Sequence, residues 1–214
     1  MTFSLLLRCP RTGQTGAAVT TSSPAVGARV AFTSRHGGVL TQARTDPRLG
    51  PRGLQLLAEG CGAQDTLAAL VATAIAPRWR QLAVLDREGR TAHHTGASIR
   101  GALAAAEGPG CVAIGNILAH GEVPRAMLDA ALAAPDEPLA ERLLRALEAG
   151  EAAGGEGRPL ESAALRVEGG HGFAHVDLRV DFDPLPLRAL RRCWEAYAPM
   201  EPVVVTRALD PEAA

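Results

Sequence analysis

Along the first 44 residues, small, apolar and β-branched residues occur in four short runs separated by glycine and proline, a pattern typical of strands. The runs extend from Thr2 to Arg8, Gly16 to Thr21, Ala25 to Phe32 and Gly38 to Arg44. Because short turns join consecutive strands in antiparallel pairs, we expect this opening segment to form an antiparallel sheet.

The hydrophobic period then changes to that of helices, with Leu54 and Leu57 after Gly50, and Leu67 and Leu70 after Asp65. The remaining pattern alternates between the two kinds of element. We expect further strands over Gln81 to Asp86, Arg90 to Thr95, Cys111 to Leu118, Ser162 to Val167 and His175 to Phe182. We expect further helices over Glu122 to Ala134, Pro138 to Gly150 and Pro186 to Tyr197.

This order predicts an α+β fold, in which two antiparallel sheets stack face to face with helices on their outer sides. No segment separates two domains, so residues 1–198 are predicted as one domain and residues 199–214 as a tail held only by Val203, Val204 and Val205. The glycine-rich stretch from Ala152 to Pro159 is predicted as a mobile loop. It follows a helix instead of opening one, so a nucleotide site there is not expected.

Composition narrows the possible functions. The chain has 214 residues, 47% of them hydrophobic, and a formal net charge of -1, which argues against nucleic acid or an anionic membrane as a partner. All its basic residues other than histidine are arginine. The absence of lysine excludes Schiff-base lysines, phosphate-loop lysines and serine–lysine nucleophile pairs.

The cysteines and the amino terminus suggest a reducing compartment. The four cysteines lie far apart, without the spacing of a zinc site or a redox pair, and the first residues resemble no secretory signal. We therefore expect a cytoplasmic protein whose mature chain begins at or just after Met1.

The histidines do not predict a metal site. His93 and His94 are neighbours in a predicted strand, so their side chains point to opposite faces. His171 and His175 are predicted to lie roughly 13 Å apart, because the glycines between them favour a turn and strand. We expect no metal and no cofactor.

Thr2 is the residue with the clearest potential for chemistry. A small side chain after the initiator permits removal of Met1, and the α-amino group thus freed on Thr2 can act as a base, since its ordinary pKa is about 7.7 to 8.0. Threonine after methionine is a very common start, however, so the residue taken alone favours an ordinary first position of a strand, and only the architecture argues for the nucleophile.

Several blocks of sequence, in order along nearly the whole chain, resemble the DUF1028 family of bacterial proteins with an N-terminal nucleophile (Ntn) hydrolase-like fold. These blocks are Thr2-Phe3-Ser4, Gly16 to Val19, Ala25 to Gly27, Thr41 to Leu54, Gly115 to Leu118, Leu139 to Leu144, Ala149-Gly150, Gly154-Gly155, Ser162 to Leu165 and Asp177 to Asp181.

The resemblance implies a four-layer αββα sandwich and hydrolysis of an amide bond. It implies Thr2 as the nucleophile, and it makes Gln42 and Asn116 the neutral amides able to donate to a developing oxyanion. Arg44, with Asp46 nearby, could hold a substrate carboxylate. The residues themselves leave two structural alternatives open. Asn116 is as compatible with a hydrogen bond to the backbone as with a catalytic role, and Arg44 is as compatible with an ion pair that ties a strand to a helix as with ligand binding.

Two functions remain open from the sequence. The first is a cytoplasmic amidohydrolase that acts on a small-molecule amide or peptide-like substrate through Thr2. The second is a non-catalytic small-molecule binding or scaffold protein of the same fold, because the chain has Thr21-Ser22 where family members usually carry Ser-Lys, and Ile114 where they carry Gln. Its alanine-rich outer helices would suit a homodimer.

Overall fold

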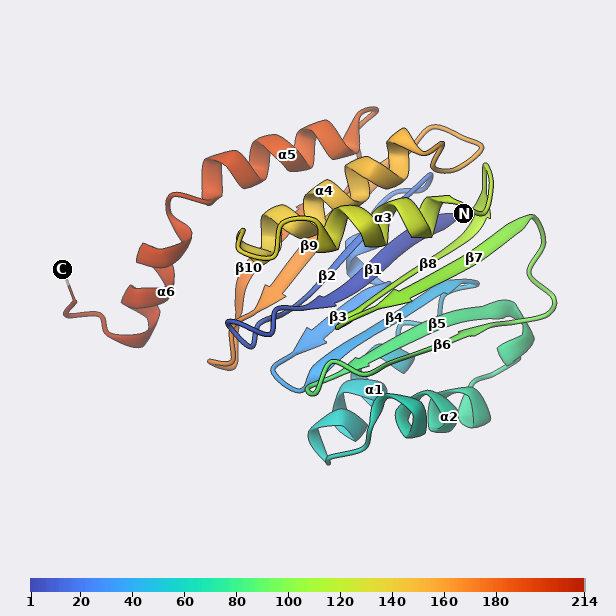
Figure 1. The fold of residues 1–214 in the computed structure, drawn as a ribbon, viewed down its shortest axis with the longest axis horizontal. Coiled ribbons are helices and arrows are strands. Elements are labelled where there is room, and N and C mark those ends of the chain that lie inside the picture. Colours follow the sequence, from blue (N-terminus) through green and yellow to red (C-terminus); the bar gives the residue numbers. More distant parts are fainter. Residues whose placement is uncertain (214) are drawn as a thin grey trace.

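The computed structural model of the chain describes residues 1–213 and shows two antiparallel sheets stacked face to face, with helices on both outer sides (Figure 1). The six-stranded sheet has the order β10-β9-β2-β1-β8-β7. Its strands are β1 (Thr2–Arg8), β2 (Thr15–Thr21), β7 (Ala102–Gly108), β8 (Cys111–Leu118), β9 (Ser162–Glu168) and β10 (Ala174–Val180). The predicted α+β sandwich of two antiparallel sheets is therefore confirmed.

The second sheet has four strands in the order β3-β4-β5-β6. They are β3 (Ala31–Ser34), β4 (Gly37–Ala43), β5 (Arg80–Asp86) and β6 (Thr91–Thr95). Every pair in both sheets is antiparallel, as expected of strands joined mainly by short turns.

The helices form the outer layers. Those packed on the four-stranded sheet are α1 (Leu49–Ala58) and α2 (Ala63–Thr73). Those on the side of the six-stranded sheet are α3 (Val123–Leu132), α4 (Leu139–Ala152) and α5 (Pro186–Tyr197) (Figure 1). Within residues 1–213, no helix is both long enough and apolar enough to cross a bilayer.

Alternation of side chains along the strands sorts the core into layers. On β1, Phe3, Leu5 and Leu7 pack beneath the helices of the larger sheet, whereas Leu6 packs between the two sheets. A third apolar cluster lies between the smaller sheet and its two helices. By the same period of two, Thr2 and Ser4 share the face of Leu6 and point toward the opposite sheet.

Two parts of the chain differ from the prediction. The run Ala25 to Phe32 is not one strand: Val26–Ala28 form the short 3-10 helix η1, and Ala25 has a left-handed backbone. The strand β7 was not predicted, because its sequence ALAAAEG lacks a hydrophobic alternation. Pairing with β8 defines this strand, which no local pattern reveals.

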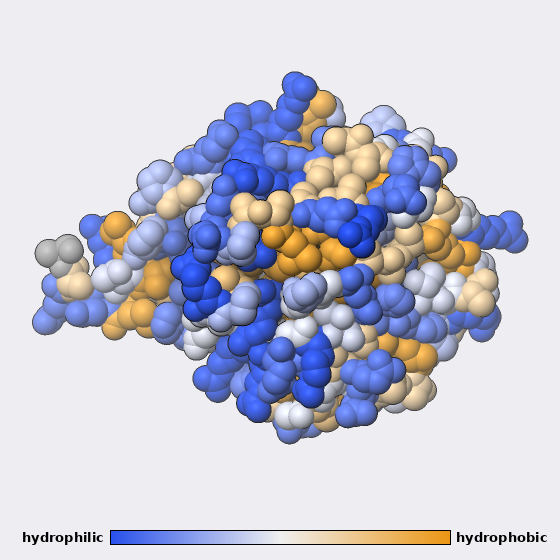
Figure 2. All heavy atoms as spheres, viewed as in Figure 1, coloured by the Kyte–Doolittle hydropathy of each residue, from blue (hydrophilic) through white to orange (hydrophobic). Residues whose placement is uncertain are grey.

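The tail predicted from Pro199 contains a helix, α6 (Glu201–Leu209), at the end of the molecule opposite the amino terminus (Figure 1). None of its residues is buried. Figure 2 shows hydrophobic side chains gathered around this segment, where Met200, Val203 and Leu209 are exposed.

Candidate functional site

The layer between the two sheets changes from apolar to polar at one end. Five strands each place one buried polar residue at this end. Each of these residues lies two positions along its strand from an apolar or small residue on the same face, which points toward the opposite sheet. The residues are Thr2 on β1, Thr21 on β2, Gln42 on β4, Gln81 on β5 and Asn116 on β8. Strand pairing brings them together, since Thr2 lies opposite Asn116 and Gln42 opposite Gln81.

Thr2 begins the strand β1, which β2 and β8 flank on either side, and only 6% of the residue is exposed. Its Oγ1 lies 3.2 Å from Oγ1 of Thr21. Both hydroxyl groups also donate to the carbonyl oxygen of Met1. The hydroxyl of Thr2 is thus bound to the residue that precedes it.

Three fully buried amides form a cluster behind Thr2. Gln81 Oε1 accepts hydrogen bonds from Gln42 Nε2 at 2.8 Å and from Asn116 Nδ2 at 3.0 Å. Both of these nitrogens also lie 3.5 Å from the carbonyl oxygen of Thr2. Ser4 Oγ donates to Gln42 Oε1 at 2.6 Å. The cluster therefore fixes the backbone that carries Thr2, and Asn116 Oδ1 is left without a hydrogen-bond partner.

A buried carboxyl group lies near the amino terminus. Glu156, which is 8% exposed, accepts a hydrogen bond from the backbone N–H of Ser22 at 3.1 Å, while its Oε1 has no partner. Burial raises the pKa of Glu156, and the Ser22 bond, the positive amino terminus and the Thr21 hydroxyl partly oppose this. Burial lowers the pKa of the Met1 α-amino group, which the charge of Glu156 in turn raises.

The loop that carries Glu156 is the glycine-rich segment predicted as a mobile connection. Instead, it is held against the end of β8 by a bridge between Glu156 and Leu118 and by the bond from Ala119 N to Gly155 O at 3.0 Å. A single acidic residue in a glycine-rich loop gives little sequence signal. Only its burial beside the amino terminus identifies Glu156.

A cavity of about 420 Å³ opens at this polar end of the inter-sheet layer. It is lined by Met1, Ala43, Arg44, Trp79, Ile99, Arg100, Asn116 and Ile117. The lining contains two arginines and no acidic residue. Its size lies at the lower end of the range of small-molecule sites.

Arg44 and Asp46, predicted as a substrate-binding pair, separate in the structure. The Arg44 guanidinium stacks on Trp79, with its central carbon 4.3 Å from the ring centroid, and lines the cavity. Asp46 is instead bound by Arg48 through two hydrogen bonds of 2.8 Å, which hold the pKa of Asp46 below its usual range. Arg44 is therefore free to meet a ligand, whereas Asp46 already has a partner.

The backbone is strained at two residues of the cavity wall. Ala43 has a φ of 70° and Ile117 a φ of 54°, in the left-handed region that L-residues other than asparagine and aspartate rarely adopt. Each directly follows an amide of the buried cluster, Gln42 or Asn116. Such strain is commonly found at functional sites, where the surrounding structure maintains it.

The structure thus brings Thr2, Gln42 and Asn116 together and places Arg44 at the same cavity, which Asn116 also lines. Sequence interpretation missed Gln81, Glu156, Trp79 and Arg100. The sequence does contain a signal for Gln81. A glutamine before the apolar run Leu82 to Leu85 lies in a buried strand, so its side chain needs hydrogen-bond partners in the interior.

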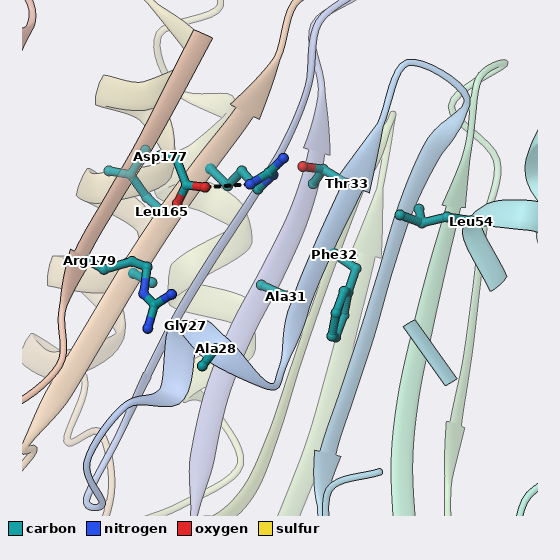
Figure 3. Close-up of a pocket in the computed structure, with 11 residues that line it drawn as sticks. Gly27, Ala28, Ala31, Phe32, Thr33, Leu54, Leu165, Asp177 and Arg179 are labelled. Atoms are coloured by element: carbon teal, nitrogen blue, oxygen red, sulfur yellow. Dashed lines mark hydrogen bonds and ion pairs between the residues drawn. The ribbon is translucent and has the colours of Figure 1, made fainter. Parts of the chain in front are cut away.

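A second cavity, of about 290 Å³, lies between β3 and the strands β9 and β10 (Figure 3). Asp177 and Arg179 lie on one side of it, and Phe32 and Thr33 on the other. Asp177 pairs with Arg166, and Arg179 with Asp181 at 2.9 Å. Its charged groups already have partners within the chain, so this cavity is a weaker site than the one beside Thr2.

The prediction for His171 and His175 is wrong in its geometry. His171 Nδ1 lies 2.8 Å from His175 Nε2, and the two rings stack with centroids 5.0 Å apart, because the β9–β10 turn folds His171 back over the strand. Among residues 1–213, no three side chains of histidine, cysteine, aspartate or glutamate come together as a group able to hold a metal ion.

Comparisons with known proteins agree on the family. The family model "Family of unknown function (DUF1028)" matches residues 2–190. Among solved structures, the chain is similar to protein SPO2555 from Silicibacter pomeroyi, whose description gives the same family model. The two are 32% identical, the match covers 92% of this chain and 88% of that one, and the TM-score is 0.85. No curated protein matches the chain.

Proposed function

The chain belongs to the DUF1028 family of unknown function, and from its own geometry we propose that it is an amidohydrolase of the Ntn type. It would cleave an amide bond in a small or peptide-like substrate, with Thr2 as the nucleophile after removal of Met1. Such enzymes activate the hydroxyl of their first residue with the α-amino group of that same residue.

The position of Met1 carries this proposal. Met1 lines the cavity, and its carbonyl oxygen accepts hydrogen bonds from the hydroxyls of both Thr2 and Thr21. Removing Met1 takes away this acceptor and extends the cavity to Thr2 Oγ1. It also converts the backbone amide nitrogen of Thr2 into a free α-amino group.

In the proposed reaction, Thr2 supplies both the nucleophile and the base, and water is the second reactant. The α-amine takes the proton of Thr2 Oγ1, and Oγ1 attacks the carbonyl carbon of the substrate. The C–N bond breaks, the departing nitrogen receives that proton, and the acyl group remains on Thr2 as an ester. Water gives a proton to the same α-amine and attacks the ester carbon. The bond between Thr2 Oγ1 and the acyl carbon then breaks, Oγ1 takes that proton back from the ammonium group, and the acid is released.

The neighbouring polar residues position these groups. Gln42 and Asn116 direct their N–H groups to Gln81 and to the Thr2 carbonyl, so in this proposal they hold the nucleophile in place. Asn116 alone of the two lines the cavity, where it could also touch a substrate. Glu156 supplies negative charge close to the amino terminus, which favours the ammonium form after proton transfer.

The alternative is a non-catalytic small-molecule binding protein, which corresponds to a chain that keeps Met1. In that state Thr2 is only 6% exposed and its hydroxyl is bound to Met1, while the cavity is still present. The two functions therefore differ in one covalent bond, between Met1 and Thr2.

Intact-mass spectrometry of untagged protein, before and after incubation with p-nitrophenyl acetate, tests the proposal. We expect protein without Met1 to gain one acetyl group on Thr2 that hydroxylamine removes, as an ester requires. Thr2→Ser should react and Thr2→Ala, which also permits removal of Met1, should not form this ester. Complete retention of Met1, or equal ester formation in Thr2→Ala, would overturn the proposal.

A further inference from the structure

In the part of the chain that the structure describes, the guanidinium groups of the two cavity arginines have no hydrogen-bond or ion-pair partner, whereas those of two nearby arginines do. Arg48 is bound by Asp46, and Arg80 donates to the backbone oxygens of Ile75 and Arg44. Within residues 1–213, the guanidinium groups of Arg44 and Arg100 make neither a hydrogen bond to the protein nor an ion pair. Both of these unpaired groups line the cavity beside Thr2.

The charge of the cavity follows from this arrangement. Arg44 and Arg100 bring two positive charges, and no acidic side chain lines the cavity to neutralise them. A guanidinium offers five N–H donors in a fork that matches a carboxylate, and it binds such a group more strongly than it binds a neutral amide. Stacking on Trp79 restricts the Arg44 side chain and so reduces the entropy lost on binding.

Apart from Met1 and the acceptor of Asn116, the rest of the lining is apolar. Trp79, Ile99 and Ile117 supply apolar surface, while Asn116 Oδ1 is buried without a hydrogen-bond partner. Because the Asn116 nitrogen is held by Gln81 at 3.0 Å, the oxygen is the atom of this fully buried side chain that is left without a partner. A ligand that donates an N–H to this oxygen would satisfy it.

We propose that the cavity binds a secondary amide that carries a free carboxylate, such as an N-acyl amino acid or the C-terminal residue of a short peptide. The carboxylate lies at Arg44 and Arg100, the amide N–H donates to Asn116 Oδ1, and the amino-acid side chain contacts Trp79 and Ile99. This inference rests on the proposed function for one point only, that the carbonyl carbon of the same amide faces Thr2. Cleavage would release the free amino acid and leave its acyl group on Thr2.

Binding can be measured without hydrolysis in the Thr2→Ala variant that has lost Met1. The probes are the N-acetyl derivatives of phenylalanine, leucine and alanine, each compared with its uncharged C-terminal amide by titration calorimetry. We expect at least one acid to bind about tenfold more tightly than its amide, and the preference to weaken as salt is raised. Arg44→Gln and Arg100→Gln should each reduce this preference, and the double variant should abolish it.

Arg52→Gln is the matched control, because Arg52 is exposed on α1, lies outside the cavity, and its loss changes the net charge equally. It should leave the preference unchanged. Equal binding of every acid and its amide, no binding of any probe, or an equal effect of Arg52→Gln would overturn the inference. Acid-selective binding in a protein whose Thr2 forms no ester would instead refute the hydrolase proposal and leave this binding site intact.

Discussion

Gln81 is predicted to hold the buried amide cluster together. Its Oε1 accepts from Gln42 and Asn116, and its Nε2 donates to Thr95 Oγ1 at 3.1 Å and to the Gly115 carbonyl oxygen at 2.9 Å. No part of the side chain is exposed, so water cannot reach these groups readily if the side chain is replaced. The substitution Gln81→Met keeps a similar volume and removes all four hydrogen bonds.

The cost follows from the groups that lose their partner. Two buried N–H groups, on Gln42 and Asn116, and the buried carbonyl of Gly115 remain, and each buried polar group without a partner costs about 1–3 kcal/mol. The N–H groups keep their contacts of 3.5 Å with the carbonyl oxygen of Thr2, which favours the lower part of that range. We therefore expect Gln81→Met to lower the free energy of unfolding by about 3–5 kcal/mol.

Thermal and urea denaturation measure this change. For a chain of this size, about 1 kcal/mol shifts Tm by about 2–4 °C, so Gln81→Met should lower Tm by about 6–20 °C. Thr95→Val is the control, since it removes one of the four bonds at a partly exposed strand and should cost about 1 kcal/mol. A Gln81→Met protein within about 1 kcal/mol of the wild type would refute the reasoning.

Three further predictions concern the amino terminus, the strained wall and a buried carboxylate. Glu156→Gln should lower the pKa of the α-amino group, because the charge of Glu156 raises it. The chain has no lysine, so the pH dependence of amine-specific labelling reports this group alone. An unchanged labelling midpoint would contradict the assignment. Ile117→Gly should stabilise the protein by about 1 kcal/mol in chemical denaturation by relieving a left-handed φ, whereas Ile117→Ala, which keeps the strain, should not. Burial alone would raise the pKa of Asp86, but hydrogen bonds from Arg90 and from the Ala63 N–H bring it below its ordinary value. Asp86 therefore contributes stability that is present above its unfolded pKa of about 3.9 and is lost as pH falls through its folded pKa, so acid should destabilise the wild type more than Asp86→Asn.

The sequence predicts well those strands and helices that bury either one whole face or all of their side chains, because this burial leaves a regular apolar pattern. The segment Thr2 to Arg8 is apolar throughout because helices cover one face and the second sheet covers the other. The strand β7 has no such burial, since it is an edge strand whose alanines are half-buried or exposed. Its conformation depends on pairing with β8, which a local pattern cannot show.

The same distinction applies to the site. Thr2, Gln42 and Asn116 were available from the sequence because they resemble positions of a known family. The burial of Gln81 was predictable from its strand, but the partners of Gln81 and Glu156 were not, since they lie 39 and 134 positions away along the chain, at Gln42 and Ser22. Periodicity indicates that such a residue faces the interior, but not which polar group it meets there.

Buried polar groups and backbone strain both reduce stability, and in this protein they occur together. At the polar end of the inter-sheet layer, Asn116 Oδ1 and Glu156 Oε1 are buried without partners, and Ala43 and Ile117 hold left-handed conformations. They are two of the seven such atoms and two of the four such non-glycine residues among residues 1–213, and their position beside Thr2 agrees with a functional site. Both unpartnered atoms are oxygens, so each requires a donor of hydrogen bonds. An α-ammonium group on Thr2 would supply one close to Glu156, and the N–H of a bound amide would supply the other at Asn116.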